Sequence, residues 1–242
     1  MEGRTKSFIK LLTKHLQLQD FFLVIDTETS GLPKNWKAPY SKEKNWPHIV
    51  QIAWIIYDFQ YQEVKRENHF IKSDGFTIDK SAEKIHGLSD DYLKNHGESL
   101  DKIMSLFCDD IIRFNPLIIG HFIELDYHMV NVELYRLGKK NVFQNSTFYC
   151  TMKTSSEYVT NPSVSHLKLD KFYTLLFNEA PLQIHNALAD ALNTAKIFFY
   201  LITNKNISLN SVYEQEHSFN KAKEISNKPS LKQIIQRLFN GK

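Results

Sequence analysis

This 242-residue sequence has few cysteines, no long apolar run and only a small net charge. The only two cysteines, Cys108 and Cys150, fit no zinc or redox spacing, so we expect free thiols in a reducing, cytoplasmic compartment. No apolar stretch is long enough to span a membrane, and the first residues lack the continuous apolar core of a secretory signal. The net charge of +3 permits a polyanionic partner without requiring one.

The length suits one large domain with small appendages, and 42% apolar with 24% charged residues is ordinary for a globular protein. We expect an N-terminal amphipathic helix over residues 1–19, a central domain over 20–203, and a polar, mildly basic helical extension over 204–242. Residues 1–19 form either a helix packed on the domain or a transit peptide. The apolar stripe near the C-terminus either binds a polymerase or second subunit, or folds back on the domain.

A run of five apolar residues, Phe21 to Ile25, leads directly into Asp26 and Glu28. Such a run predicts a buried central strand covered on both faces. Because side chains alternate along a strand, Asp26 and Glu28 share one face near its C-terminal end. Two adjacent carboxylates raise each other's pKa, and a divalent metal ion would compensate their charge. The alternative is that Asp26 caps a turn and Glu28 is solvated.

Two later helices each carry a carboxylate on a packed face. Asp126 falls on the apolar stripe of a helix that should end at Gly138, and Asp190 lies on a small-residue face of a helix with Asn186 as its expected N-cap. A buried carboxylate without a partner is costly, so a metal ion would serve both. His185 meets Asp190 only if it turns in from the preceding loop.

Apolar patterns predict further strands at residues 49–59, 64–71 and 116–120, strand or loop at 147–152, and helices at 78–88, 99–113 and 167–177. Three successive strands followed by helices indicate an antiparallel meander that opens a mixed sheet. The loop over residues 32–47 contains Trp36, Tyr40 and Trp46. These aromatic residues either stack on bases or hold the loop in place.

Three motifs in order define a pattern: Asp-x-Glu on the first strand, Asp126 in a middle helix, and His185-x-x-x-x-Asp190 at a late helix. In this order and spacing the sequence resembles the DEDDh 3′→5′ exonucleases, the family that contains the proofreading epsilon subunit of bacterial DNA polymerase III. Similarity continues between the motifs through residues 49–53, 85–88 and 150–151, and covers roughly residues 20–202.

The resemblance implies an RNase H-like α/β fold, a five-stranded mixed sheet with helices on both faces. It implies that two Mg²⁺ or Mn²⁺ ions are held by Asp26, Glu28, Asp126 and Asp190. His185 would take the proton of the attacking water, and the product would be a nucleoside 5′-monophosphate. The substrate-binding residues that the resemblance implies are Thr27, Thr29, Leu32, His86 and Phe122.

The middle motif departs from the family pattern at two positions. The family has Asn after Gly-His and Phe immediately before the Asp, and here those positions hold Phe122 and Leu125. The acid itself is present, so metal binding should persist. Contacts with the terminal nucleotide near Phe122 are expected to differ.

The resemblance favours an exonuclease that acts on the 3′ end of single-stranded or frayed DNA, because the first motif is Asp-Thr-Glu-Thr, as in the proofreading branch. The protein would then stand alone or serve a DNA polymerase as a subunit. RNA 3′-end trimming or digestion of short oligonucleotides is the alternative within this class. A catalytically silent nucleic-acid-binding module is the alternative of another class, although such a module has no need of clustered carboxylates.

Overall fold

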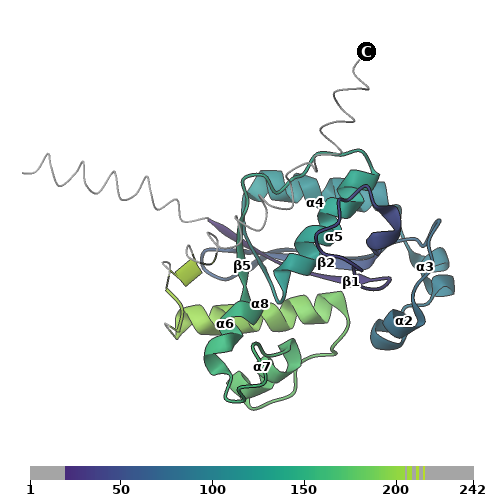
Figure 1. Ribbon diagram of the computed structural model, residues 1–242. Helices are drawn as coiled ribbons and strands as arrows, with labels where there is room; N and C mark the ends of the chain where they lie inside the picture. The colour runs from purple at the N-terminus through teal and green to yellow at the C-terminus, as the bar shows by residue number, and fades with distance from the viewer. Residues whose placement is uncertain (1–19, 205, 209–210, 213–214, 216–242) are drawn as a thin grey trace, which may run out of the picture.

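The computed structural model describes residues 20–204, 206–208, 211–212 and 215 (Figure 1). The helix predicted for residues 1–19 and most of the extension predicted for 204–242 lie outside the described residues.

The described chain is built around one five-stranded sheet of order β3-β2-β1-β4-β5. The central strand β1 (Phe21–Thr29) pairs antiparallel with β2 (Ile49–Asp58), which pairs antiparallel with β3 (Glu63–Phe70). On its other side β1 pairs parallel with β4 (Leu117–Gly120), which pairs parallel with β5 (Thr147–Cys150). The predicted mixed sheet, opened by an antiparallel meander, is confirmed.

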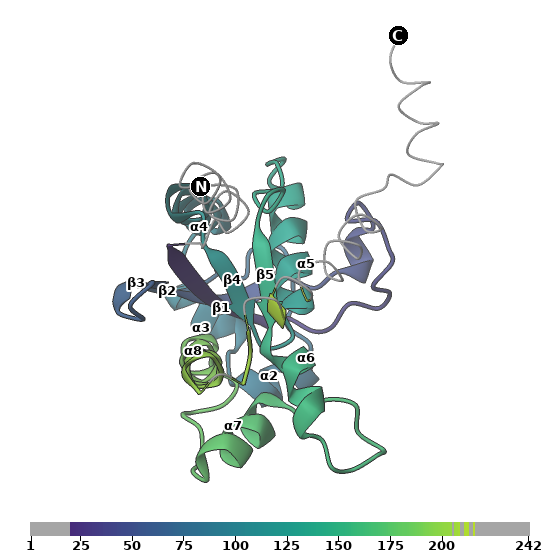
Figure 2. The ribbon, with the colours of Figure 1, turned by 90° about the vertical axis from the view of Figure 1, so that its left-hand side faces the viewer.

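Helices cover both faces of this sheet (Figures 1 and 2). One face packs against α4 (Leu100–Phe114) and α5 (Ile123–Arg136), and the other against α7 (Leu169–Phe177) and α8 (Ala187–Thr203). The remaining helical segments are α2 (Lys80–His86), α3 (Asp90–His96), α6 (Thr151–Thr154) and the short 3-10 helices η1 (Glu43–Asn45) and η2 (Ser155–Tyr158).

Alternation along β1 divides the core into two halves. Leu23 and Ile25 face α4 and α5, whereas Val24 faces α8, and all three are fully or almost fully buried. A strand buried on both faces explains the continuous apolar run before Asp26. No helix in the described part of the chain is long and apolar enough to span a membrane.

Local signals at the helix ends match the structure. The Asn186 side chain accepts a hydrogen bond from the Ala189 N–H at 3.3 Å, as an N-cap residue does. Gly87 ends α2 in the left-handed region, at φ 74°, where a side chain would be strained. The Asn186 cap fixes the start of α8 directly after His185.

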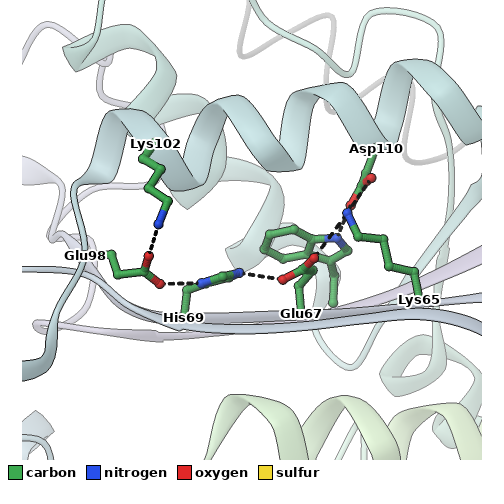
Figure 3. Close-up of polar contacts among 7 residues, drawn as sticks. Lys65, Glu67, His69, Glu98, Lys102 and Asp110 are labelled. Atoms are coloured by element: carbon green, nitrogen blue, oxygen red, sulfur yellow. Dashed lines mark hydrogen bonds and ion pairs between the residues drawn. The ribbon is translucent and has the colours of Figure 1, made fainter.

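A polar network joins the edge strand β3 to α4 (Figure 3). The buried Asp110 carboxylate accepts hydrogen bonds from Trp54 Nε1 at 2.8 Å and from Lys65 Nζ at 2.7 and 2.8 Å. These bonds satisfy polar atoms that would be costly to bury alone. The rest of the network consists of Glu67, His69, Glu98 and Lys102.

Candidate active site

The carboxyl end of β1 projects beyond its neighbour β4. Pairing between the two strands runs only to Val24 and Ile119, and the chain leaves β4 at Gly120 to enter α5. Asp26 and Glu28, both half-buried, stand on the part of β1 that pairs with β2 but not with β4. In open α/β sheets the carboxyl ends of parallel strands form the ligand crevice.

Asp126 enters the crevice from the first turns of α5. Its side chain is only 3% exposed, and Thr27 Oγ1 donates a hydrogen bond to its Oδ1 at 2.7 Å. A Cβ on Gly120 would lie 3.3 Å from Asp126 Oδ2 and 2.8 Å from Ile123 Cδ1, so a larger residue there would force these side chains to shift. Thr27 is buried, and its hydroxyl positions Asp126, so a contact between Thr27 and substrate would come from its backbone.

Asp190 and His185 arrive together at the start of α8. The His185 N–H donates to Asp190 Oδ2 at 3.0 Å, and the left-handed conformation of His185, at φ 61°, lets the exposed residue turn in from the loop. One ligand atom each from Glu28, His185 and Asp190 lies within 4.8 Å of the others. The structure therefore places His185 beside Asp190, as the sequence predicted for a His185 that turns in from the preceding loop.

Burial raises the pKa of all four carboxyls, and repulsion between neighbouring carboxylates raises it further for Asp26 and Glu28. Burial is the largest cause in each case; it raises the pKa of Asp126 to about 7 and that of Asp190 to about 6. Burial and the neighbouring Asp190 and Asp126 raise the pKa of Glu28 to about 8, and burial together with the other three carboxyls raises that of Asp26 well above its usual value. Carboxylates held this way disfavour ionisation unless a cation joins them.

The donor set fits a divalent cation. Among the described residues, no lysine or arginine forms an ion pair with any of the four acids, so neither residue type balances their charge. Asp190 Oδ1 is buried and, within the part of the chain that the structure describes, has no hydrogen-bond partner. An orphaned carboxylate oxygen beside other oxygen donors is what Mg²⁺ or Mn²⁺ would coordinate.

Two buried amides position α8, and sequence reasoning did not assign them this role. Gln51 Oε1 accepts from the Ala187 N–H at 3.3 Å, while its Nε2 donates to Asn68 Oδ1 at 2.8 Å. Asn193 Oδ1 accepts from the Leu182 N–H at 3.0 Å and so ties down the loop before His185. A polar residue inside an apolar strand, as Gln51 is, was the available signal.

The remaining predicted substrate-binding residues lie at or just after the end of β1 and at the end of α2. Leu32 is 71% exposed just beyond β1, and the Thr29 hydroxyl donates to the Gly31 carbonyl at 2.6 Å. His86 accepts the Leu88 N–H on its Nδ1 at 3.0 Å. Burial lowers the pKa of His86, although the nearby Thr29 backbone acts in the opposite direction.

The aromatic residues of the aromatic loop, which we define as residues 32–47, differ in their packing. Trp46 is 3% exposed and stacks on His128 at 5.2 Å between ring centroids, and the Tyr40 hydroxyl lies 2.9 Å from His128 Nδ1. These two residues hold the loop against α5. Trp36 is half-buried and contacts Phe122 at 5.6 Å between centroids. Phe122 itself is the N-cap of α5, with φ 70° and ψ 42°.

Comparison with known protein families indicates which reaction a site of this geometry catalyses. The exonuclease family model named RNase_T matches residues 23–198, which include all four acids and the histidine. The chain therefore belongs to this exonuclease family, and its domain is of the DEDDh 3′→5′ exonuclease type.

Solved structures with the same fold include exonuclease I and 3′hExo. E. coli exonuclease I in complex with a dT13 oligonucleotide is 16% identical with a TM-score of 0.62, and the match covers 76% of this chain and 41% of that one. The nuclease domain of 3′hExo, a DEDDh family member bound to rAMP, is 12% identical with a TM-score of 0.61, and the match covers 78% of this chain and 94% of that one. The chain thus spans less than half the length of exonuclease I. Comparison with curated proteins gave no match.

Proposed function

We propose that this protein hydrolyses the last phosphodiester bond at the 3′ end of single-stranded or frayed DNA, releases nucleoside 5′-monophosphates, and uses two Mg²⁺ or Mn²⁺ ions. One observation carries the proposal. Four carboxylates with raised pKa values and an exposed histidine converge at the open carboxyl end of β1, with no lysine or arginine paired to them among the described residues.

In this proposal Asp26, Glu28, Asp126 and Asp190 supply the oxygen ligands. When bound, the ions compensate negative charge and make a water molecule more acidic. Protein hydrogen bonds hold two of these carboxylates: the Thr27 hydroxyl donates to Asp126 Oδ1 at 2.7 Å, and the His185 N–H donates to Asp190 Oδ2 at 3.0 Å. Because the protein orients these two ligands, they need little rearrangement when a phosphate arrives.

His185 is the proposed general base. Its ring atoms lie near Glu28 and Asp190, its side chain is exposed, and its backbone is fixed by the hydrogen bond to Asp190 Oδ2. Imidazole accepts protons near neutral pH, so a histidine placed beside the carboxylates can take the proton of the attacking water.

The terminal nucleotide is proposed to lie against the end of β1. Glu28 and the Thr29 backbone would contact its 3′-hydroxyl, which restricts cleavage to chain ends. His86, next to the Thr29 backbone, would line the base pocket, and the exposed Leu32 would wedge against the terminal base.

DNA is the proposed substrate because the first motif, Asp26-Thr27-Glu28-Thr29, is that of the proofreading branch. The exonuclease I relative was solved with a DNA oligonucleotide, which supports the same choice. RNA 3′-end trimming is the second candidate, supported by the 3′hExo relative bound to rAMP. We propose a role in proofreading or repair in the cytoplasm, alone or beside a DNA polymerase.

Side-by-side digestion of labelled substrates tests the proposal. DNA and RNA are compared as single strands, duplexes and duplexes with a 3′ mismatch, each with Mg²⁺, Mn²⁺ or EDTA. We expect single-stranded and mismatched DNA to be degraded fastest, and EDTA or Asp190→Asn to abolish turnover. Asp74→Asn, on an exposed loop, is the matched control. Faster digestion of RNA would favour the second candidate, and turnover in EDTA would overturn the metal-dependent mechanism.

A further inference from the structure

We infer that Trp36 and Phe122 form a stacking platform for the bases upstream of the scissile bond, and that the aromatic loop guides a flexible single strand to the carboxylates. The inference rests on the proposed function and specifies the substrate: a nucleic acid strand whose bases are unpaired next to its 3′ end.

The platform has a rigid support. The Trp36 and Phe122 rings lie 5.6 Å apart between centroids with an interplanar angle of 58°, and both residues are half-buried. Trp36 also contacts Trp46 and His128, at 6.4 and 5.9 Å, and these two residues are almost fully buried. An aromatic pair fixed in this way loses little freedom when a base stacks on it.

The platform lies beside the reacting groups and on the α5 side of the crevice. Phe122 precedes Asp126 by about one helical turn. Figures 1 and 2 show the aromatic loop running along α5, whereas α2, which carries His86, lies on the side of α8. If the terminal base occupies the pocket near His86, the preceding bases pass on the side of Trp36.

The backbone of Phe122 lies in the left-handed region, with φ 70° and ψ 42°. A bulky residue in the left-handed region is a steric outlier, and such strain clusters at functional sites. The resemblance places asparagine at this position, which tolerates the left-handed region more easily. The ring that contacts Trp36 therefore belongs to a residue with an unfavourable backbone conformation.

The charge of the loop matches a polyanion. It carries four exposed lysines against one glutamate, Glu43, whereas the whole chain has a net charge of only +3. None of these lysines forms an ion pair with a residue that the structure describes, so their charge is available to phosphates. The lysines are Lys34, Lys37, Lys42 and Lys44.

Binding without turnover tests the platform directly. The dissociation constant of a 5′-fluorescein oligothymidylate is measured by anisotropy, with Ca²⁺ in place of Mg²⁺, for the wild type, Trp36→Leu and Phe122→Asn. Loss of base stacking should weaken binding by roughly 5- to 100-fold. Phe59→Leu is the matched control, because Phe59 is exposed at the turn after β2, at the opposite end of the sheet. Unchanged binding in Trp36→Leu and Phe122→Asn would overturn the inference.

Substrates with single abasic positions separate stacking from misfolding. An abasic site at the second or third nucleotide from the 3′ end should weaken binding to the wild type. At one of these positions the same abasic site should leave the affinity of Trp36→Leu almost unchanged, because the variant already lacks the stacking partner. Additive losses at every position would contradict the platform, since independent effects add. Wild-type protein that binds but does not hydrolyse DNA or RNA with Mg²⁺ or Mn²⁺ would overturn the proposed function and leave the platform standing.

Discussion

Replacing Glu28 by glutamine should stabilise the metal-free protein, although the substitution removes a proposed catalytic residue. Burial, Asp190 and Asp126 together raise the pKa of Glu28 to about 8. Glutamine has nearly the same shape and cannot ionise, so Glu28→Gln keeps the packing and removes both the cost of burying a charge and the repulsion from Asp190 and Asp126. A site assembled for a cation should be more stable when one of its charges is deleted.

The size of this effect follows from the pKa. The folded state binds the proton more tightly than the unfolded state, in which the pKa is 4.5. The contribution of Glu28 to stability is therefore fully present below pH 4.5, the unfolded-state pKa, and is lost as the pH rises through about 8, the folded-state pKa. Each pKa unit corresponds to about 1.4 kcal/mol, so at about pH 7 the loss relative to glutamine is on the order of 3 kcal/mol.

Urea unfolding in EDTA measures this difference. The free energy of unfolding of Glu28→Gln should exceed that of the wild type by on the order of 3 kcal/mol at about pH 7 and by much less at about pH 5. Saturating Mn²⁺ should then stabilise the wild type more than the variant, because the ion binds only the folded site. A variant no more stable than the wild type at neutral pH, or a gap that ignores pH, would refute the reasoning.

Three further substitutions test how the acids are held. Thr27→Val removes the hydrogen bond to Asp126 and should weaken metal affinity about 10- to 100-fold, measured as the Mg²⁺ dependence of turnover; unchanged dependence would show that the bond does not matter. Gly120→Ala forces a Cβ against Ile123 and Asp126 and should destabilise the fold by about 1–3 kcal/mol and lower kcat, whereas full activity would mean that the helix shifts freely. Gln51→Leu frees the Ala187 N–H and should cost about 1–3 kcal/mol, read from thermal unfolding, with no change counting against its role in anchoring α8.

Much of the fold was predictable because local patterns decide it. The apolar run before Asp26 placed the central strand, and Asn186 marked the start of a helix at the right position. The helical stripe also placed Asp126 on a packed face, and Asp126 is almost fully buried. Hydrophobic periodicity predicts secondary structure well where one face of a helix or strand must be buried.

The support of the site was not predictable, because it depends on contacts between residues far apart in the chain. Thr27 meets Asp126 across 99 positions, and Gln51 meets Ala187 across 136. The pairing of Trp36 with Phe122 depends on a left-handed residue that no propensity favours. The sequence left open whether the loop aromatics hold the loop in place or stack on bases. The structure shows Tyr40 and Trp46 packed on His128 of α5, and Trp36 half-buried beside Phe122.

The central claim is that the four carboxylates and His185 act together, with metal ions, on a 3′ end. The most direct measurement follows release of label from single-stranded DNA labelled at either end, with Mg²⁺ or Mn²⁺, for the wild type and Asp26→Asn. We predict that the 3′ label leaves first as a nucleoside 5′-monophosphate, and that EDTA or Asp26→Asn abolishes its release. Release from the 5′ end, internal cleavage, or full activity in Asp26→Asn would contradict the account.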